Sequence, residues 1–120
     1  MLANLNYNDE NYTYAKDLFK EFITAYSGSE ILISSAYAGV AACEEKEDKL
    51  FEAAEDYYKA YSVAEELPQA GEYLYLAGLN YLNANDQAKA KEMFEKLIDE
   101  FPNSPKKYDA QVKLILASAQ

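Results

Sequence analysis

The stretch from Tyr75 to Pro105, "YLAGLNYLNANDQAKAKEMFEKLIDEFPNSP", decides the fold class. Its second half places small or apolar residues on one side of a helix of 3.6 residues per turn, in the series Ala90, Met93, Phe94, Leu97, Ile98 and Phe101. The turn "NAND" precedes this series and ends at Asp86, and Pro102 follows it. The pattern therefore predicts a helix from about residue 86 to residue 100.

The same periodicity occurs twice more in the chain. A shift of 75 residues gives only small or apolar residues: Ala15, Leu18, Phe19, Phe22, Ile23 and Tyr26. A shift of 36 residues keeps the first four positions and turns the last two polar: Ala54, Tyr57, Tyr58, Tyr61, Ser62 and Glu65. Self-similarity at about 36 to 39 residues is typical of stacked supersecondary units, so the chain is predicted to be a helical repeat.

Capping residues, glycine and proline divide the rest of the chain into helices. The predicted caps are Asn8 or Asp9, Ser29 and Ser104, Asp86 is expected to begin a helix after the turn "NAND", and "SGS" and "FPNSP" interrupt the periodicity. The expected helices are about residues 9–26, 30–46, 50–66, 68–83, 86–100 and 105–120. No segment alternates with a period of two, and the short connections require antiparallel neighbours. We expect an all-α fold of about six helices.

Composition excludes several classes of partner. The 120 residues are half hydrophobic, which suits one domain with a buried core. Against 21 acidic residues there are 11 lysines and no arginine, and the net charge of −10 repels phosphate backbones and anionic lipids. We therefore expect no nucleic-acid partner and no direct binding to anionic membranes. No run resembles a signal or a membrane span, so the chain as given is expected to be soluble.

Residues for covalent or metal chemistry are scarce. Cys43 is the single cysteine and the chain has no histidine, so neither a tetrahedral zinc set nor a Cys–His nucleophile pair can form. The acidic run "EEKEDK" at 44–49 lacks the alternating oxygens and the turn glycine of a calcium loop, and we expect it to be a solvated helix end. The tyrosines are expected to pack between helices with their hydroxyls reaching water. The sequence predicts no enzyme, no metal and no cofactor.

The quoted stretch resembles a tetratricopeptide repeat (TPR). The pattern W-x2-L-G-x2-Y, A-x3-F and P is matched without a gap by Leu74, Ala77, Gly78, Tyr81, Ala90, Phe94 and Pro102, with Leu for Trp and Ala for Leu. In the middle unit Ala38 and Gly39 are aligned with Ala77 and Gly78, and Ala54 and Tyr58 with Ala90 and Phe94, which requires three extra residues in the turn. The resemblance implies a right-handed α/α solenoid of helical hairpins.

On this alignment residues 1–120 form one TPR-like domain. It comprises a half repeat at 1–27, repeats at 28–67 and 68–104, and a C-terminal half repeat or capping helix at 105–120. The linker "FPNSP" and the aromatic second helices are also similar to TPR proteins of the bacterial cell envelope, of the outer-membrane assembly lipoprotein or Tol-Pal-associated type. That similarity implies a periplasmic or envelope location for a bacterial chain, and without it the expected location is cytoplasmic.

The resemblance also implies a site for a protein or peptide partner. In such solenoids the first helix of each hairpin lines a concave groove. The positions carried over are Ile33, Tyr37, Val40, Cys43, Glu44, Tyr75, Leu76, Leu79 and Asn83. The expected function is a non-catalytic interaction or scaffold module. The alternatives left open are that these residues only pack against neighbouring repeats, and that the half repeats at the two ends stack to give homo-oligomers.

Overall fold

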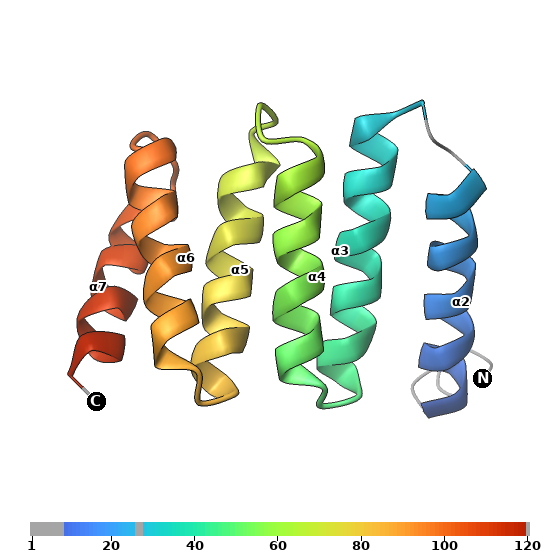
Figure 1. Ribbon diagram of the computed structural model, residues 1–120, viewed down its shortest axis with the longest axis horizontal. Coiled ribbons are helices and arrows are strands. Elements are labelled where there is room, and N and C mark those ends of the chain that lie inside the picture. The colour runs from blue at the N-terminus through green and yellow to red at the C-terminus, as the bar shows by residue number, and fades with distance from the viewer. Residues whose placement is uncertain (1–8, 26–27, 120) are drawn as a thin grey trace.

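The computed structural model describes residues 9–25 and 28–119 and places six α-helices and no strand in that part of the chain. The helices are α2 (Asp9–Ala25), α3 (Glu30–Lys46), α4 (Leu50–Val63), α5 (Gln69–Asn83), α6 (Gln87–Glu100) and α7 (Lys107–Ser118). Neighbouring helices run in opposite directions along the stack (Figure 1). The predicted all-α fold is confirmed. The expected cap at Asn8 and the expected helix end at Tyr26 lie outside the described residues.

Helix ends follow local capping chemistry. The Ser29 hydroxyl accepts a hydrogen bond from the Leu32 amide at 3.4 Å and caps α3, as predicted. Asp86, which the sequence predicts to be the first helical residue, is instead the cap of α6 and accepts a hydrogen bond from the Lys89 amide at 3.1 Å. The predicted start of the last helix at residue 105 is two residues early. The Ser104 hydroxyl instead accepts from the Lys106 amide at 3.1 Å and stabilises a turn, so α7 begins at residue 107.

The turns of the stack repeat with a constant spacing of 37 residues. Asp48 and Asn85 both have positive φ, 63° and 67°, in the turns after α3 and α5. In each of these turns an amide bonds to the carbonyl five residues earlier, in the pairs Lys49 to Glu44 (2.8 Å) and Asp86 to Tyr81 (2.9 Å). The linkers after α4 and α6 share the bonds Leu67 to Ala64 (3.1 Å) and Ser104 to Phe101 (3.0 Å). Each pair of equivalent residues differs by 37 in number, for example 85 minus 48.

This spacing corrects the register inferred for the middle unit. Gly78 is equivalent to Ala41 rather than to Gly39, and no three-residue insertion is present. Both glycines accept an aromatic ring at a position that a Cβ atom would occupy, but the rings come from different neighbours. Phe94 on α6 fills the space at Gly78, whereas Phe19 on α2 fills the space at Gly39. The two glycines therefore look alike in sequence while serving different helix contacts.

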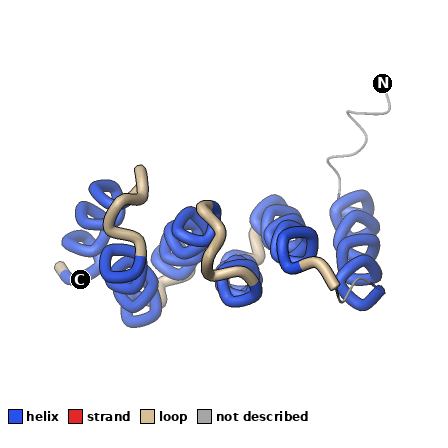
Figure 2. Tube along the Cα trace, turned by 90° about the horizontal axis from the view of Figure 1, so that it is seen from above, coloured by secondary structure: helices blue, strands red, loops and turns tan. Residues whose placement is uncertain are grey.

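Viewed from above, the helices form two staggered layers (Figure 2). The helices α3, α5 and α7 form one layer, and α4 and α6 form the other, with α2 next to α3 at the end of the stack. Buried alanines such as Ala53, Ala77 and Ala90 allow close helix approach, and Leu74, Phe94 and Leu97 fill the interior with no exposed area. The core therefore follows the stack, and the outer faces of the two layers remain for contacts with other molecules.

Candidate partner-binding surface

The helix α5 is accessible to solvent mainly along one narrow strip. Glu72, Leu76, Leu79 and Asn83 are spaced by four, three and four residues and so share one side of the helix. Glu72 and Asn83 are exposed, and the two leucines are half-buried. The other sides of α5 pack against α4 and α6 and are buried. The strip lies on the side of α5 that faces away from α4 and α6.

The 37-residue period extends this strip over the neighbouring helices. The equivalent described positions are Ser35, Gly39, Ala42 and Lys46 in α3 and Asp109, Lys113 and Leu116 in α7. At Gly39 the ring of Phe19 from α2 covers the strip. We call all eleven residues the outer strip of the α3–α5–α7 layer. Its side chains on α3 are small except for Lys46, its two middle residues on α5 are leucines, and on α7 it carries Leu116 beside the charged Asp109 and Lys113.

The structure places only some of the predicted site residues on this strip. Leu76, Leu79 and Asn83 belong to it. Tyr75 is 8% exposed, its ring centroid is 6.0 Å from that of Phe94, and Lys106 Nζ lies 5.2 Å from its ring centroid. Tyr75 therefore packs toward α6 and the next linker rather than outward.

The predicted residues of α3 lie away from the outer strip. Val40 is 1% and Glu44 6% exposed, and both are interior. Tyr37 is half-buried with Lys59 of α4 over its ring at 5.9 Å, Cys43 lines a hollow next to α2, and Ile33 is half-buried. The register that paired Gly39 with Gly78 selected these residues. The 37-residue period selects the side of α3 that carries Ser35 and Ala42 instead.

A hydrogen-bond network fixes three helices relative to one another. The Glu45 carboxylate accepts from the Tyr57 hydroxyl at 3.2 Å and from Asn80 Nδ2 at 2.7 Å, which links α3, α4 and α5. Asn80 is 3% exposed and also donates to the Leu76 carbonyl at 2.9 Å. Burial, and then the Glu45 carboxylate, raise the pKa of Tyr57, so its hydroxyl stays protonated as a donor. Sequence reasoning missed this network because Glu45 and Asn80 are 35 residues apart.

The acidic run at 44–49 ends α3 as predicted but is solvated only in part, since Lys46, Asp48 and Lys49 are exposed whereas Glu44 is buried and Glu45 and Glu47 are half-buried. Lys16 Nζ of α2 lies 2.6 Å from Glu47 Oε1, and the two side chains are only 10% and 6% exposed. The Thr13 hydroxyl donates to the other oxygen of Glu47 at 3.2 Å. The hydrogen bond from Lys16 lowers the pKa of Glu47, and Glu47 raises the pKa of Lys16. This partly buried ion pair connects α2 to the turn after α3.

Glu44 is a buried carboxyl in the same junction. Its Oε1 atom has no hydrogen-bond partner among the described residues. Burial, and then the neighbouring Asp56 of α4, raise the pKa of Glu44 to about 8, and Lys16 and Lys20 of α2 oppose this shift. Glu44 is therefore largely protonated at neutral pH, and the unfavourable burial of a second carboxylate beside Asp56 is avoided.

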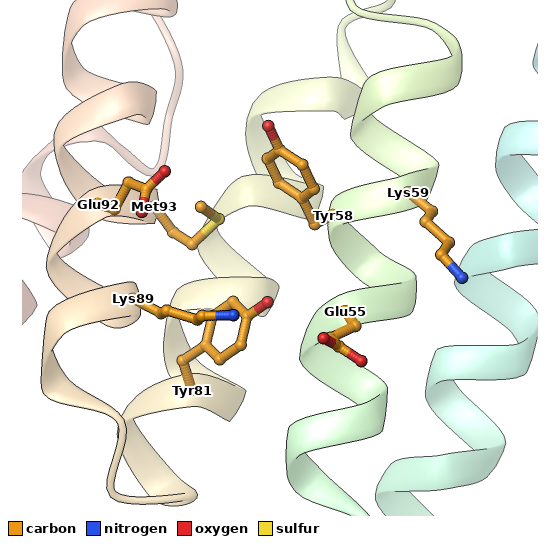
Figure 3. A pocket seen from close by; sticks show the side chains of 7 residues that line it. All are labelled: Glu55, Tyr58, Lys59, Tyr81, Lys89, Glu92 and Met93. Carbon is orange, nitrogen blue, oxygen red and sulfur yellow. The ribbon is translucent and has the colours of Figure 1, made fainter.

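The opposite layer carries a hollow of about 410 Å³ between α4 and α6 (Figure 3). Lys89 extends from α6 across the ring of Tyr81, with its Nζ atom 5.6 Å from that ring centroid and 5.2 Å from that of Phe51. Lys59 points away toward α3 (Figure 3). The protein's own ammonium group already occupies the aromatic surface. The residues that line this hollow thus stabilise the packing of α4 and α6 and are not arranged for catalysis.

The repeated turns and staggered layers define a TPR-like helical repeat. Residues 72–104 match the family model of the tetratricopeptide repeat, which covers α5 from its first turn, α6 and the turn that follows. No curated protein and no solved structure matches the chain. The family match is typical of modules for protein–protein interaction, and it indicates no catalytic family.

Two further properties of the described residues bear on the function. None of the helices in residues 9–25 and 28–119 is long and apolar enough to cross a membrane. In the same part of the chain no three His, Cys, Asp or Glu side chains are grouped so that they could hold a metal ion.

Proposed function

We propose that the chain is a non-catalytic interaction module that binds a segment of a partner protein along the outer strip of the α3–α5–α7 layer. The observation that carries this proposal is the accessibility of Leu76, Leu79 and Leu116 on a layer that presents equivalent positions every 37 residues. The network of Glu45, Tyr57 and Asn80 beneath the strip supports a preformed surface, which lowers the conformational cost of binding.

The proposed repeat units are 28–67 and 68–104, with half repeats at 1–27 and 105–120. Only the second full unit coincides with the family match. The similarity of the "FPNSP" linker to bacterial envelope proteins supports a periplasmic or envelope location as a proposal of its own, and it rests on the sequence alone.

A peptide-display selection against the purified chain tests the partner site. We expect selected peptides to bind the wild type and to lose about tenfold or more in affinity for Leu79→Asp, because a buried apolar contact is replaced by a charge. Glu95→Lys on the exposed side of α6 is the control and should leave binding unchanged. Circular dichroism checks that both variants stay helical. Equal binding to Leu79→Asp and the wild type would contradict the proposed site.

We propose self-association as a second candidate function. The observation that favours it is the large exposed apolar area on the two end helices, where Tyr14 is 65% and Tyr108 73% exposed. Sedimentation equilibrium over a wide concentration range tests it, and a monomer at every concentration would contradict it.

A further inference from the structure

The exposed apolar side chains are concentrated at the two ends of the stack. Nine large apolar side chains are exposed in the described residues, and six of them lie on α2 and α7. The six are Tyr14, Leu18, Tyr108, Val112, Ile115 and Leu116. Patches of this kind mark interaction surfaces in soluble proteins. The identity of the partner follows from which kind of neighbouring helix is missing at α2 and at α7.

The open face of α7 corresponds to a covered face of α5. Tyr108, Val112 and Ile115 are 73%, 56% and 69% exposed and share one side of α7. Their equivalents 37 residues earlier are Gly71, Tyr75 and Gly78. Phe94 of α6 covers Tyr75 and Gly78, and Phe101, directly after α6, covers Gly71. The face of α7 therefore has the geometry that receives an antiparallel helix of the α4–α6 layer.

The helix α2 has the matching position in the stack. It precedes α3 as α4 precedes α5, and it leaves Tyr14 and Leu18 exposed at 65% and 48%. These residues, with Ala15, line a hollow of about 430 Å³ that also includes Cys43 of α3. A helix of the α3–α5–α7 layer could enter this hollow and contact both α2 and α3. Each end thus lacks the kind of helix that the other end presents.

Charge distinguishes this pairing from a pairing of like ends. Within the described part of the chain, α7 is the one helix with more basic than acidic residues, since Lys107 and Lys113 outnumber Asp109. On α2, Asp17 and Glu21 are exposed beside Leu18. In a chain with a net charge of −10, contact between α7 and α2 brings opposite charges together, whereas contact between two α2 helices brings like charges together.

We propose that α7 of one chain packs antiparallel against α2 of a second copy, so that the chains stack head to tail. The inference rests on the proposed self-association and specifies its contact. The two helices lie at opposite ends of the molecule and run in opposite directions (Figure 1), so translation along the stack places them side by side as neighbouring helices are within one chain. Such a heterologous contact leaves a free end on each side and produces an open series.

Two blocked variants test this contact by sedimentation equilibrium. Leu18→Asp prevents contact through α2, and Ile115→Asp prevents contact through α7. Both side chains are exposed, so the variants should fold. We expect the wild type to form a concentration-dependent series, each variant alone to be monomeric, and an equimolar mixture to form a one-to-one dimer and nothing larger. Ala88→Asp, which adds the same charge at an exposed site on α6, is the control and should associate as the wild type does.

The outcomes separate the contact from self-association in general. A monomeric wild type overturns both. A wild type that associates while Leu18→Asp still dimerises overturns the α7–α2 contact but leaves self-association standing. As a second test, Lys107→Glu with Lys113→Glu should weaken association about tenfold or more at low salt, and adding Asp17→Lys with Glu21→Lys should restore it. Failure of the four-residue variant to recover would also overturn the pairing.

Discussion

The contact between α5 and α6 and the junction of α2, α3 and α4 share a backbone geometry but differ in chemistry. In the first, Phe94 fills the space at Gly78, and Tyr81 is 5% exposed. In the second, the position equivalent to Tyr81 is held by Glu44, which is 6% exposed, 37 residues earlier. The comparison teaches that the repeat fixes where a side chain is buried without fixing what that side chain is. The comparison predicts that the stability contributed by the first region depends on apolar packing, whereas the stability contributed by the second depends on pH.

The largest expected effect is at the apolar contact. Phe94→Ala should lower the free energy of unfolding by about 4 kcal/mol, because the ring has no exposed area and its removal leaves a cavity beside Gly78. Phe19→Ala should cost only about 1–2 kcal/mol, since Phe19 is half-buried at the end of the stack. Urea unfolding followed by circular dichroism measures both. Equal losses would show that the two ring contacts are equivalent after all.

The next effect is at Glu44. Its pKa is raised to about 8 in the folded protein from the ordinary 4.5, so the folded state holds a proton that the unfolded state releases as pH rises. Stability of the wild type should therefore fall between about pH 4.5 and pH 8. Glu44→Gln cannot ionise, and we expect it to be more stable than the wild type by about 2–3 kcal/mol at pH 8.5.

Unfolding curves at several pH values check the Glu44 prediction. The difference between Glu44→Gln and the wild type should vanish below about pH 4.5, where both carry a neutral side chain. A difference that does not change with pH would show that Glu44 is ionised throughout.

The smallest of the three effects concerns the ion pair of Lys16 and Glu47. Lys16→Met should cost about 2 kcal/mol at pH 7, because it leaves the buried Glu47 carboxylate with only Thr13 and Lys49, whose Nζ atom is 3.9 Å away. The pKa of Glu47 is lowered in the fold, so the stability supplied by the pair is present above its ordinary pKa and is lost as pH falls through the folded value.

The exposed pair of Lys96 and Glu100, 3.3 Å apart on α6, provides the matched control. Lys96→Met should change the free energy of unfolding by less than about 0.5 kcal/mol, because exposed pairs of this spacing contribute little. Thermal and urea unfolding compare the two variants. A loss at Lys96 as large as that at Lys16 would remove the distinction between the two regions.

Helix spacing and caps were sufficient to predict the architecture. The periodicity of Ala90, Phe94 and Leu97 predicts α6, and Ser29 and Asp86 mark helix starts that the structure confirms. The boundary errors at α4 and α7 arise where a turn of hydrogen bonds competes with the last or first helical turn, as at Ser104.

The candidate site was less predictable, because its position depends on register. A glycine signals a close contact but does not say which neighbouring helix makes it, so Gly39 was aligned with Gly78 and the predicted residues of α3 shifted away from the outer strip. The buried Glu44 and the network of Glu45 with Asn80 could not be predicted either. Their burial depends on partners 12 or more residues away, whereas an acidic run by itself is typical of a solvated surface.

The order of contacts along the stack has a consequence for how the molecule comes apart. Each helix packs mainly against the one before and the one after it, so the fold is a linear series of helix–helix interfaces rather than one central core. Opening α2 or α7 breaks one interface, whereas opening α4 or α5 breaks two. Amide protons should consequently exchange fastest in the terminal helices and slowest in the middle, and the protein can shorten from either end while its central hairpins stay intact.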